Sequence, residues 1–150
     1  MRGLLLLALV AACGSKDAAD DYVKKSKETE ARLHLSRIAR DVKDYAAERG
    51  ALPAGTAGPT PATPCCSTPS KKCALVPAEW ETPVWQLLKF QPLEEPRFQY
   101  SYTSDGKTFT ATATGDVQCS GTPTTFTITG SLTGSDVTID TSQIDFKKKQ

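Results

Sequence analysis

Apolar residues recur at helical spacing after a charged N-terminal stretch and predict one long helix over residues 22–49. The stripe consists of Ala31, Leu35, Ile38, Val42, Tyr45 and Ala46. Such a stripe occupies one face of a helix and needs a partner surface to cover it. Residues 24–30 (KKSKETE) lack the stripe and predict a charged, projecting stalk, while Gly50 and Pro53 are stop signals.

Strict alternation of apolar and polar residues predicts four strands in the second half of the chain. Their inward positions are Phe98, Tyr100 and Tyr102; Phe109, Ala111 and Ala113; Phe126 and Ile128; and Val137 and Ile139. Two turn sequences connect neighbouring strands. Residues 104–107, with Asp-Gly at the centre, join the first strand to the second, and residues 133–136 join the third to the fourth. The chain is therefore predicted to be α+β, with the long N-terminal helix packed on a four-stranded antiparallel sheet.

The segment between helix and sheet shows a change of composition. Residues 51–64 are rich in Pro, Thr, Gly and Ala and predict an irregular surface loop. Thr82 and Pro83 are an N-cap and a first-turn proline, so they predict a short second helix. Trp80 and Trp85 lie on either side of this start, and we expect them to pack on the core.

The first residues have the pattern of a bacterial lipoprotein signal peptide over 1–12. Arg2 is followed by a short apolar run, then by Ala11-Ala12-Cys13. The run is about half the length needed to cross a bilayer core of roughly 30 Å. Cys13 is predicted to be lipidated and to anchor the chain to the lipid bilayer through a tether over 13–21. The alternative is a plain secretory signal with a leftover cysteine.

Gly14, directly after the lipidation candidate, is not the aspartate associated with inner-membrane retention. The expected location is therefore the cell envelope, lipid-anchored, with the outer membrane favoured over the inner one. The mature globular domain is predicted to span 22–150.

Four further cysteines, Cys65, Cys66, Cys73 and Cys119, predict two disulfides in an exported domain. Three pairings exist, and strain disfavours a bond between the two adjacent cysteines. One of the adjacent pair is then expected to bond Cys73 and the other Cys119, in either order. A zinc site is a weaker alternative because adjacent cysteines chelate poorly and no CxxC pair is present.

Charge and candidate chemistry exclude several function classes. The net charge of +1 gives no electrostatic reason to expect nucleic acid. The single histidine, His34, is expected at a surface or boundary, and no nucleophile motif accompanies it, so no enzyme activity or cofactor is predicted. Asp116, Gln118 and Ser120 resemble the start of a calcium loop only weakly, and turn chemistry is the favoured reading, with no metal expected.

Three stretches carry a family resemblance. KSKETEARLHLSRIARDVKDYAAERGALP resembles the second half of the N-terminal helix of type IV pilins and pseudopilins. PCCSTPSKKCALVPAEWETPVWQLLKF, followed by FQYSYTSDGKTFTATATGDVQCSGTPTTFTITG, resembles the head of the myxobacterial type of pilin-like protein. The resemblance implies a pilin-like head fold over most of the mature chain.

The N-terminus departs from the pilin pattern. Pilins carry a processing site, a glutamate and a continuous apolar helix, whereas here a short apolar run ends in Cys13. A protein without that helix is not expected to polymerise as a pilus subunit. A pilin-like head joined to a lipidation signal instead predicts a membrane-anchored, non-enzymatic lipoprotein that acts through protein contacts at the cell envelope, with pilus or type II secretion components as possible partners. The alternative is an envelope binding module for a small molecule, glycan or metal ion.

Overall fold

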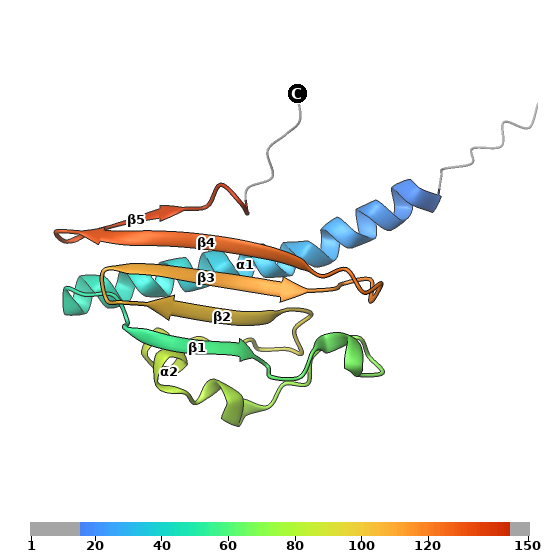
Figure 1. Cartoon of the computed structure of the whole chain (residues 1–150), viewed down its shortest axis with the longest axis horizontal. Helices are drawn as coiled ribbons and strands as arrows, with labels where there is room; N and C mark the ends of the chain where they lie inside the picture. The colour runs from blue at the N-terminus through green and yellow to red at the C-terminus, as the bar shows by residue number, and fades with distance from the viewer. Residues whose placement is uncertain (1–15, 145–150) are drawn as a thin grey trace, which may run out of the picture.

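The N-terminal helix α1 spans Lys16–Arg49 and forms the long axis of the molecule (Figure 1). The computed structural model describes residues 16–144. The predicted signal peptide, Cys13 and Gly14 lie outside the described residues. The helix begins six residues before the predicted start at Tyr22, so most of the segment predicted as a tether is helical.

The predicted apolar stripe of α1 faces the sheet. Ala31, Leu35, Ile38 and Val42 are fully buried, and Ala46 is nearly so, whereas Tyr45 lies half-buried at the edge. Burial of these side chains against the sheet, rather than helix propensity, accounts for most of the stability of such a helix. The stripe therefore predicted correctly which face of the helix is covered.

A five-stranded antiparallel sheet packs on α1, and each strand pairs with the next along the chain. Its strands are β1 (Gly55–Thr60), β2 (Gln99–Ser104), β3 (Thr108–Gly115), β4 (Thr124–Thr133) and β5 (Asp136–Asp140). The fold class is α+β, as predicted. The aromatic residues Phe98, Tyr100, Tyr102, Phe109 and Phe126 point toward the helix and are buried.

The predicted number of four strands is wrong, because β1 forms within the segment expected to be a loop. Ala57 of β1 faces the core, and Thr56 is exposed, so the strand alternates over a very short length. Its register shifts between Ala57 and Thr60, around Pro59. Proline lacks the N–H that a central strand must donate, and is tolerated here because β1 is an edge strand.

The second predicted helix, α2 (Pro83–Leu88), is present with Pro83 in its first turn. Trp80 lies at the end of a 3₁₀ turn over Pro77–Trp80. Trp80 and Trp85 are both buried, and their ring centroids lie 5.6 Å apart. Phe90 and Tyr100 complete the aromatic cluster beside α1. The expectation that both tryptophans belong to the core is confirmed. In the part of the chain that the structure describes, no helix is long and apolar enough to span a membrane.

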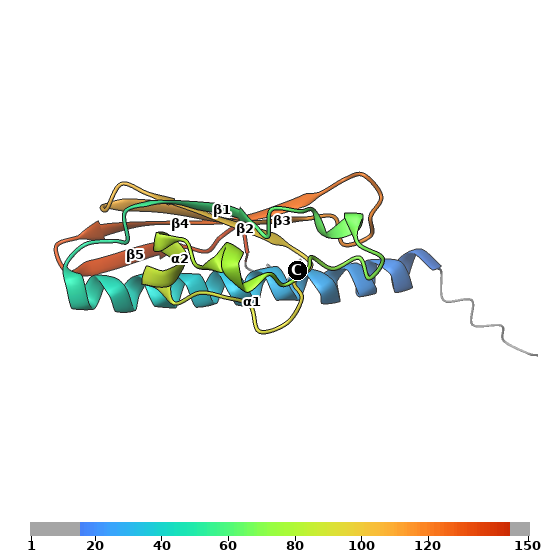
Figure 2. The ribbon, with the colours of Figure 1, turned by 90° about the horizontal axis from the view of Figure 1, so that it is seen from below.

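No element formed by residues 16–144 covers the face of the sheet opposite α1 (Figures 1 and 2). The strand registers place only Thr, Ser and Gln at the outward positions of β2, β3 and β4. These positions are Gln99, Ser101, Thr103, Thr108, Thr110, Thr112, Thr114, Thr125, Thr127, Thr129, Ser131 and Thr133. β-branched threonine suits a solvated strand position.

Candidate functional site

The four cysteines of the described chain form two disulfides, Cys65–Cys73 and Cys66–Cys119. The pairing confirms the prediction that one of the two adjacent cysteines bonds Cys73 and the other bonds Cys119. Of the two possible assignments, the structure has Cys65 bonded to Cys73. Cys65 and Cys73 are buried, whereas Cys66 is exposed and Cys119 partly so. All four sulfurs are bonded to one another in pairs and are not available as the thiolate ligands that the zinc alternative required.

The Cys66–Cys119 bridge ties the 3₁₀ turn at Cys65–Ser67 to the loop after β3, and the Cys65–Cys73 bridge closes the loop that follows this turn. Cys73 N donates a hydrogen bond to Pro96 O at 2.7 Å, so the loop is also tied to the segment leading into β2. Thr68 Oγ1 donates to Cys65 O at 3.0 Å within the loop. A segment without regular strands or helices is thereby fixed covalently to the sheet.

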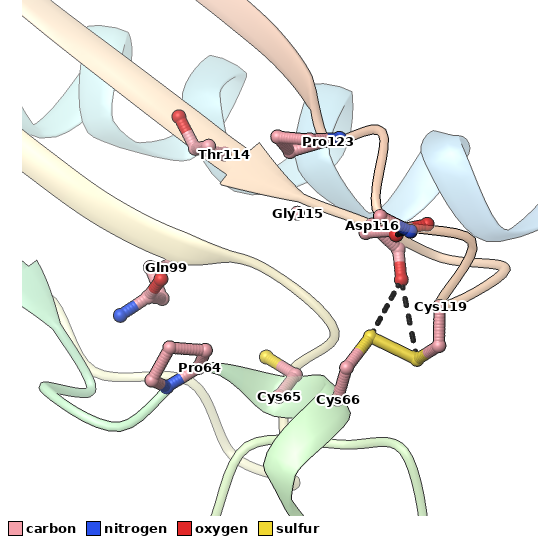
Figure 3. A pocket seen from close by; sticks show the side chains of 10 residues that line it. Pro64, Cys65, Cys66, Gln99, Thr114, Gly115, Asp116, Cys119 and Pro123 are labelled. Atoms are coloured by element: carbon pink, nitrogen blue, oxygen red, sulfur yellow. Dashed lines mark hydrogen bonds between the residues drawn. A yellow bond between two sulfur atoms is a disulfide. The ribbon is translucent and has the colours of Figure 1, made fainter.

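A cavity of about 520 Å³ lies between these bridged loops and the sheet (Figure 3). Pro64, Cys65, Cys66, Gln99, Thr114, Gly115, Asp116, Cys119, Gly121 and Pro123 line it. Prolines and disulfides supply apolar walls, and the strand ends of β2 and β3 supply the floor. The sequence indicated the bridges, but not that Gln99 and Thr114 would lie beneath them.

The polar groups of the floor are already hydrogen-bonded. Gln99 Nε2 donates to Pro61 O at 2.8 Å and to Ala62 O at 3.2 Å. The hydroxyls of Thr114 and Thr125 lie 2.9 Å apart and share a hydrogen bond. A ligand of this cavity would therefore contact mainly apolar surface, and no side chain of the floor is placed as a nucleophile or base.

Asp116 organises the loop that follows β3. Its Oδ2 accepts N–H bonds from Gly121 at 2.6 Å and Thr122 at 3.1 Å, and its Oδ1 accepts one from Gln118 at 3.2 Å. Limited desolvation acts to raise the pKa of Asp116, but the backbone N–H groups of the loop outweigh it, and the pKa lies below its ordinary value. Its backbone carbonyl oxygen lies 3.0 Å from Cys66 Sγ, a close contact without a shared hydrogen because the sulfur is in a disulfide (Figure 3).

The calcium-loop candidate is a poor fit to this geometry. Both carboxylate oxygens of Asp116 are used by backbone donors, and Ser120 Oγ lies 3.5 Å from Oδ1, as a hydrogen-bonding partner. Calcium requires six to eight oxygen ligands, usually several of them carboxylates. Within residues 16–144 no group of three or more His, Cys, Asp or Glu side chains is placed to hold a metal ion.

His34 lies at the boundary between α1 and the core. Its Nδ1 is 2.8 Å from the Tyr100 hydroxyl, and its ring packs edge-on against Phe90. Burial lowers the pKa of His34, with a smaller opposing effect from Glu30. Burial raises the pKa of Tyr100 well above its ordinary value. The pair is a partly buried polar contact at the edge of the core.

A groove of about 450 Å³ lies between α1 and the segment that follows α2. Glu30 Oε1 accepts a bond from Arg97 N at 2.7 Å, and its Oε2 pairs with Arg97 Nη1 at 3.0 Å. Arg37 donates to Gln91 O at 3.0 Å and Lys89 O at 3.1 Å. These bonds fix the segment against the helix. No prediction was made for this segment, although the isolated leucine in QPLEEP was a usable signal.

Comparisons of the chain with known protein families, with curated proteins and with solved structures found no match. The pilin resemblance and the lipid anchor therefore stay predictions from the sequence.

Proposed function

We propose that this chain is a membrane-anchored, non-enzymatic, pilin-like lipoprotein whose head acts through protein contacts at the cell envelope. The observation that carries this proposal is the division of α1. Residues 31–46 pack on the sheet, whereas residues 16–23 are exposed and extend beyond it (Figure 1). A helix that projects from its own domain at the end nearest a predicted anchor is suited to carry a head.

The distance from anchor to head follows from the helix geometry. Cys13 lies three residues before Lys16, where α1 begins. At about 1.5 Å per residue, the 11 residues from Lys16 to Lys27, whose Nζ donates to Val117 O at 3.1 Å, span roughly 16 Å. A lipidated Cys13 would therefore hold the head away from the headgroups on a helical segment. The segment that projects is not the predicted charged stalk at 24–30, because Lys27 contacts the loop after β3 and Glu28 is buried.

The same geometry orients the head. The disulfide-bridged loops lie at the end of the sheet nearest the start of α1, and the turns at 104–107 and 133–136 lie at the other end (Figure 1). An anchored head would turn its cavity toward the membrane and those two turns away from it. Components of pilus or type II secretion machinery are the proposed partners of the membrane-distal end.

Metabolic labelling with a clickable fatty acid, in cells producing the wild type or Cys13→Ser, tests the anchor. We expect label and membrane fractionation for the wild type and loss of both for the variant. Equal labelling of the two would contradict the anchor. Photo-cross-linking from residue 135 in the distal turn then tests the partner class, and recovery of no filament or secretion component would contradict that part of the proposal.

An envelope binding module is the second candidate, favoured by the cavity in Figure 3 and by the outward row of hydroxyl side chains. A thermal-shift screen of small apolar molecules and soluble glycans on the purified chain tests it. A ligand whose stabilising effect is lost in Thr114→Lys, at the cavity floor, but kept in Thr110→Lys, further along the open face, would place binding in the cavity. A screen in which no compound raises the melting temperature would count against a binding module.

A further inference from the structure

The side of α1 that faces away from the sheet carries a second stripe. Ala19, Tyr22, Ser26, Thr29 and Leu33 follow one another at intervals of three, four, three and four residues. At 100° per residue these positions share one side of the helix, roughly opposite the stripe that begins at Ala31. The alternation of three and four is the spacing of a seam between two paired helices.

Large apolar side chains concentrate on this side. Tyr22 is 75% exposed, Val23 48%, Leu33 65% and Leu93 90%. Among residues 16–144 only Val76 and Leu87 are further large apolar side chains of comparable exposure. Three of these six, Tyr22, Leu33 and Leu93, therefore lie along this side of the helix and its adjoining groove, and Val23 lies on its flank, which is the distribution expected of a contact surface rather than of scattered exposed residues.

Leu93 extends the stripe because its segment passes along the far side of α1. Figure 2 shows the yellow segment after α2 on the side of the helix away from the sheet. Leu33 and Leu93 both line the groove described above, and the Glu30–Arg97 and Arg37 bonds hold that segment in place. The apolar stripe thus ends in a pre-formed depression with an apolar side chain on each wall.

We propose that this surface, Ala19 to Leu33 with Leu93, pairs with the same surface of a second copy to form a parallel helix pair on the membrane. The inference rests on the proposed anchor, because a lipid on each Cys13 would set two α1 helices side by side with the same polarity and register. The surface would then meet itself, as a two-fold symmetric interface requires.

Charge and size favour the second copy as occupant. In a parallel pair with Ala19, Ser26 and Leu33 at equivalent seam positions, Lys25 and Glu30 flank the seam, and the lysine of each copy lies on the side of the glutamate of the other. Within its own chain Lys25 pairs with Asp21 at 2.7 Å and Glu30 with Arg97 at 3.0 Å, so a pair between the helices would share these partners. The small side chains of Ala19 and Ser26 allow the backbones to approach closely. The sheet lies on the side of α1 opposite the stripe (Figure 2), so in such a pair both sheets would face outward.

The anchor is needed for the pair to form. Four helical turns bury less than the roughly 800 Å² per partner of a standard stable interface, so we expect a monomer in solution. Tethering both copies to one surface raises the effective concentration toward the millimolar range. Dimers are therefore expected on vesicles, and monomers for the unlipidated protein at micromolar concentration.

The test places a photo-reactive p-benzoyl-phenylalanine in the full lipidated chain on phosphatidylcholine vesicles. Position 26 lies on the seam, and position 20, exposed in the same segment but on the other side of the helix, is the matched control. Flotation of the vesicles reports the anchor independently. We expect a cross-linked species of twice the chain mass from position 26, with the cross-link mapped to residues 19–33, and at least fivefold less from position 20.

A chain that floats but gives no dimer from position 26, or gives equal dimer from both positions, overturns the pairing and leaves the anchor standing. A chain that does not float overturns both proposals. As a second readout, Leu33→Asp should reduce the position-26 dimer at least fivefold, whereas Leu87→Asp, an exposed leucine on α2, should leave it unchanged. Both leucines are exposed, so neither substitution opens the core, and equal dimer yields from the two variants would also contradict the pairing.

Discussion

Trp85 Nε1 donates a hydrogen bond to Thr60 Oγ1 at 2.9 Å, which joins α2 to the last residue of β1 inside the core. Both side chains are buried. The bond satisfies an indole N–H that has no access to water, and it also fixes the edge strand that sequence reasoning did not find. Its removal should therefore destabilise the fold and not merely loosen a surface.

Thr60→Val keeps the shape of the side chain and removes the acceptor. Because a buried donor left without a partner costs about 1–3 kcal/mol, we expect the free energy of unfolding to fall by that amount in urea titrations. Thr110→Val, the same change at an exposed position of β3, should alter it by less than about 0.5 kcal/mol. Equal effects of the two substitutions would show that the hydrogen bond contributes nothing.

The two disulfides should differ in their contribution to stability. The residues of Cys66–Cys119 are 53 apart in sequence and those of Cys65–Cys73 are 8 apart. The chain-entropy relation gives about 4 kcal/mol for the longer loop and about 2.5 kcal/mol for the shorter one. Urea unfolding of the paired alanine variants under non-reducing conditions is expected to rank Cys66→Ala/Cys119→Ala as the less stable. The reverse order would indicate that burial of Cys65 and Cys73 outweighs loop closure.

Exposure should also decide which bridge is reduced first. Thiol–disulfide exchange requires access of the attacking thiolate to the sulfur, and Cys66 is exposed whereas Cys65 and Cys73 are buried. Brief treatment with a thiol reductant, followed by alkylation and peptide mass analysis, should therefore label Cys66 and Cys119 before the other pair. Simultaneous labelling of all four would mean that reduction proceeds through global unfolding.

His34 should make stability depend on pH in the mildly acidic range. Burial lowers the pKa of His34 below 6.5 in the folded chain, so the unfolded chain binds its proton at higher pH. The free energy of unfolding should then fall as pH is lowered from about 6.5 through the folded pKa. NMR titration of this single histidine should give a pKa below 6.5, and His34→Leu should flatten the urea-measured stability between pH 7 and pH 5. An unshifted pKa would contradict the prediction.

Asp116 should act as the organiser of its loop and not as a calcium ligand. Asp116→Ala is expected to speed amide hydrogen exchange at Gly121 and Thr122, which donate to its carboxylate, whereas Asp136→Ala in the distal turn should not. The pKa of Asp116 in the folded chain is lowered from 3.8. Protection of these amides should therefore be complete at pH values above 3.8, and it should be lost as the pH falls through the pKa of the folded state. Millimolar calcium should leave the melting temperature unchanged, and a rise of several degrees would reinstate the calcium loop.

Most of the core could be predicted because its pattern is periodic. The spacing of Ala31, Leu35, Ile38 and Val42 indicated the covered face of α1, and alternation from Phe98 to Ile139 indicated four strands and their inward sides. The possible disulfide pairings were reduced from three to two because a bond between the adjacent residues Cys65 and Cys66 would be strained. In each case a local rule and the tertiary contacts agree.

The features that were missed depend on tertiary context. β1 contributes only one inward-facing apolar residue to the core, Ala57, and contains Pro59, so nothing local distinguishes it from a loop. The register between β2 and β3 places Gln99 beside Thr114 in the cavity floor. The disulfides then bring loops that are distant in sequence over these two residues. The second stripe of α1 was not predicted for a different reason. Its large apolar residues, Tyr22 and Leu33, with Val23 on the flank, are too few to form a recognisable pattern until the position of the sheet shows which side of the helix is free.

The Cys66–Cys119 bridge makes residues 66–119 a covalent ring that contains α2, β2 and β3. A protease that cuts the chain once between these cysteines produces two pieces that stay joined through sulfur. The nicked protein would migrate at full mass on a non-reducing gel and fall apart only with reductant. A chain built this way can be cleaved once between Cys66 and Cys119 without losing the part of the fold that follows the cut.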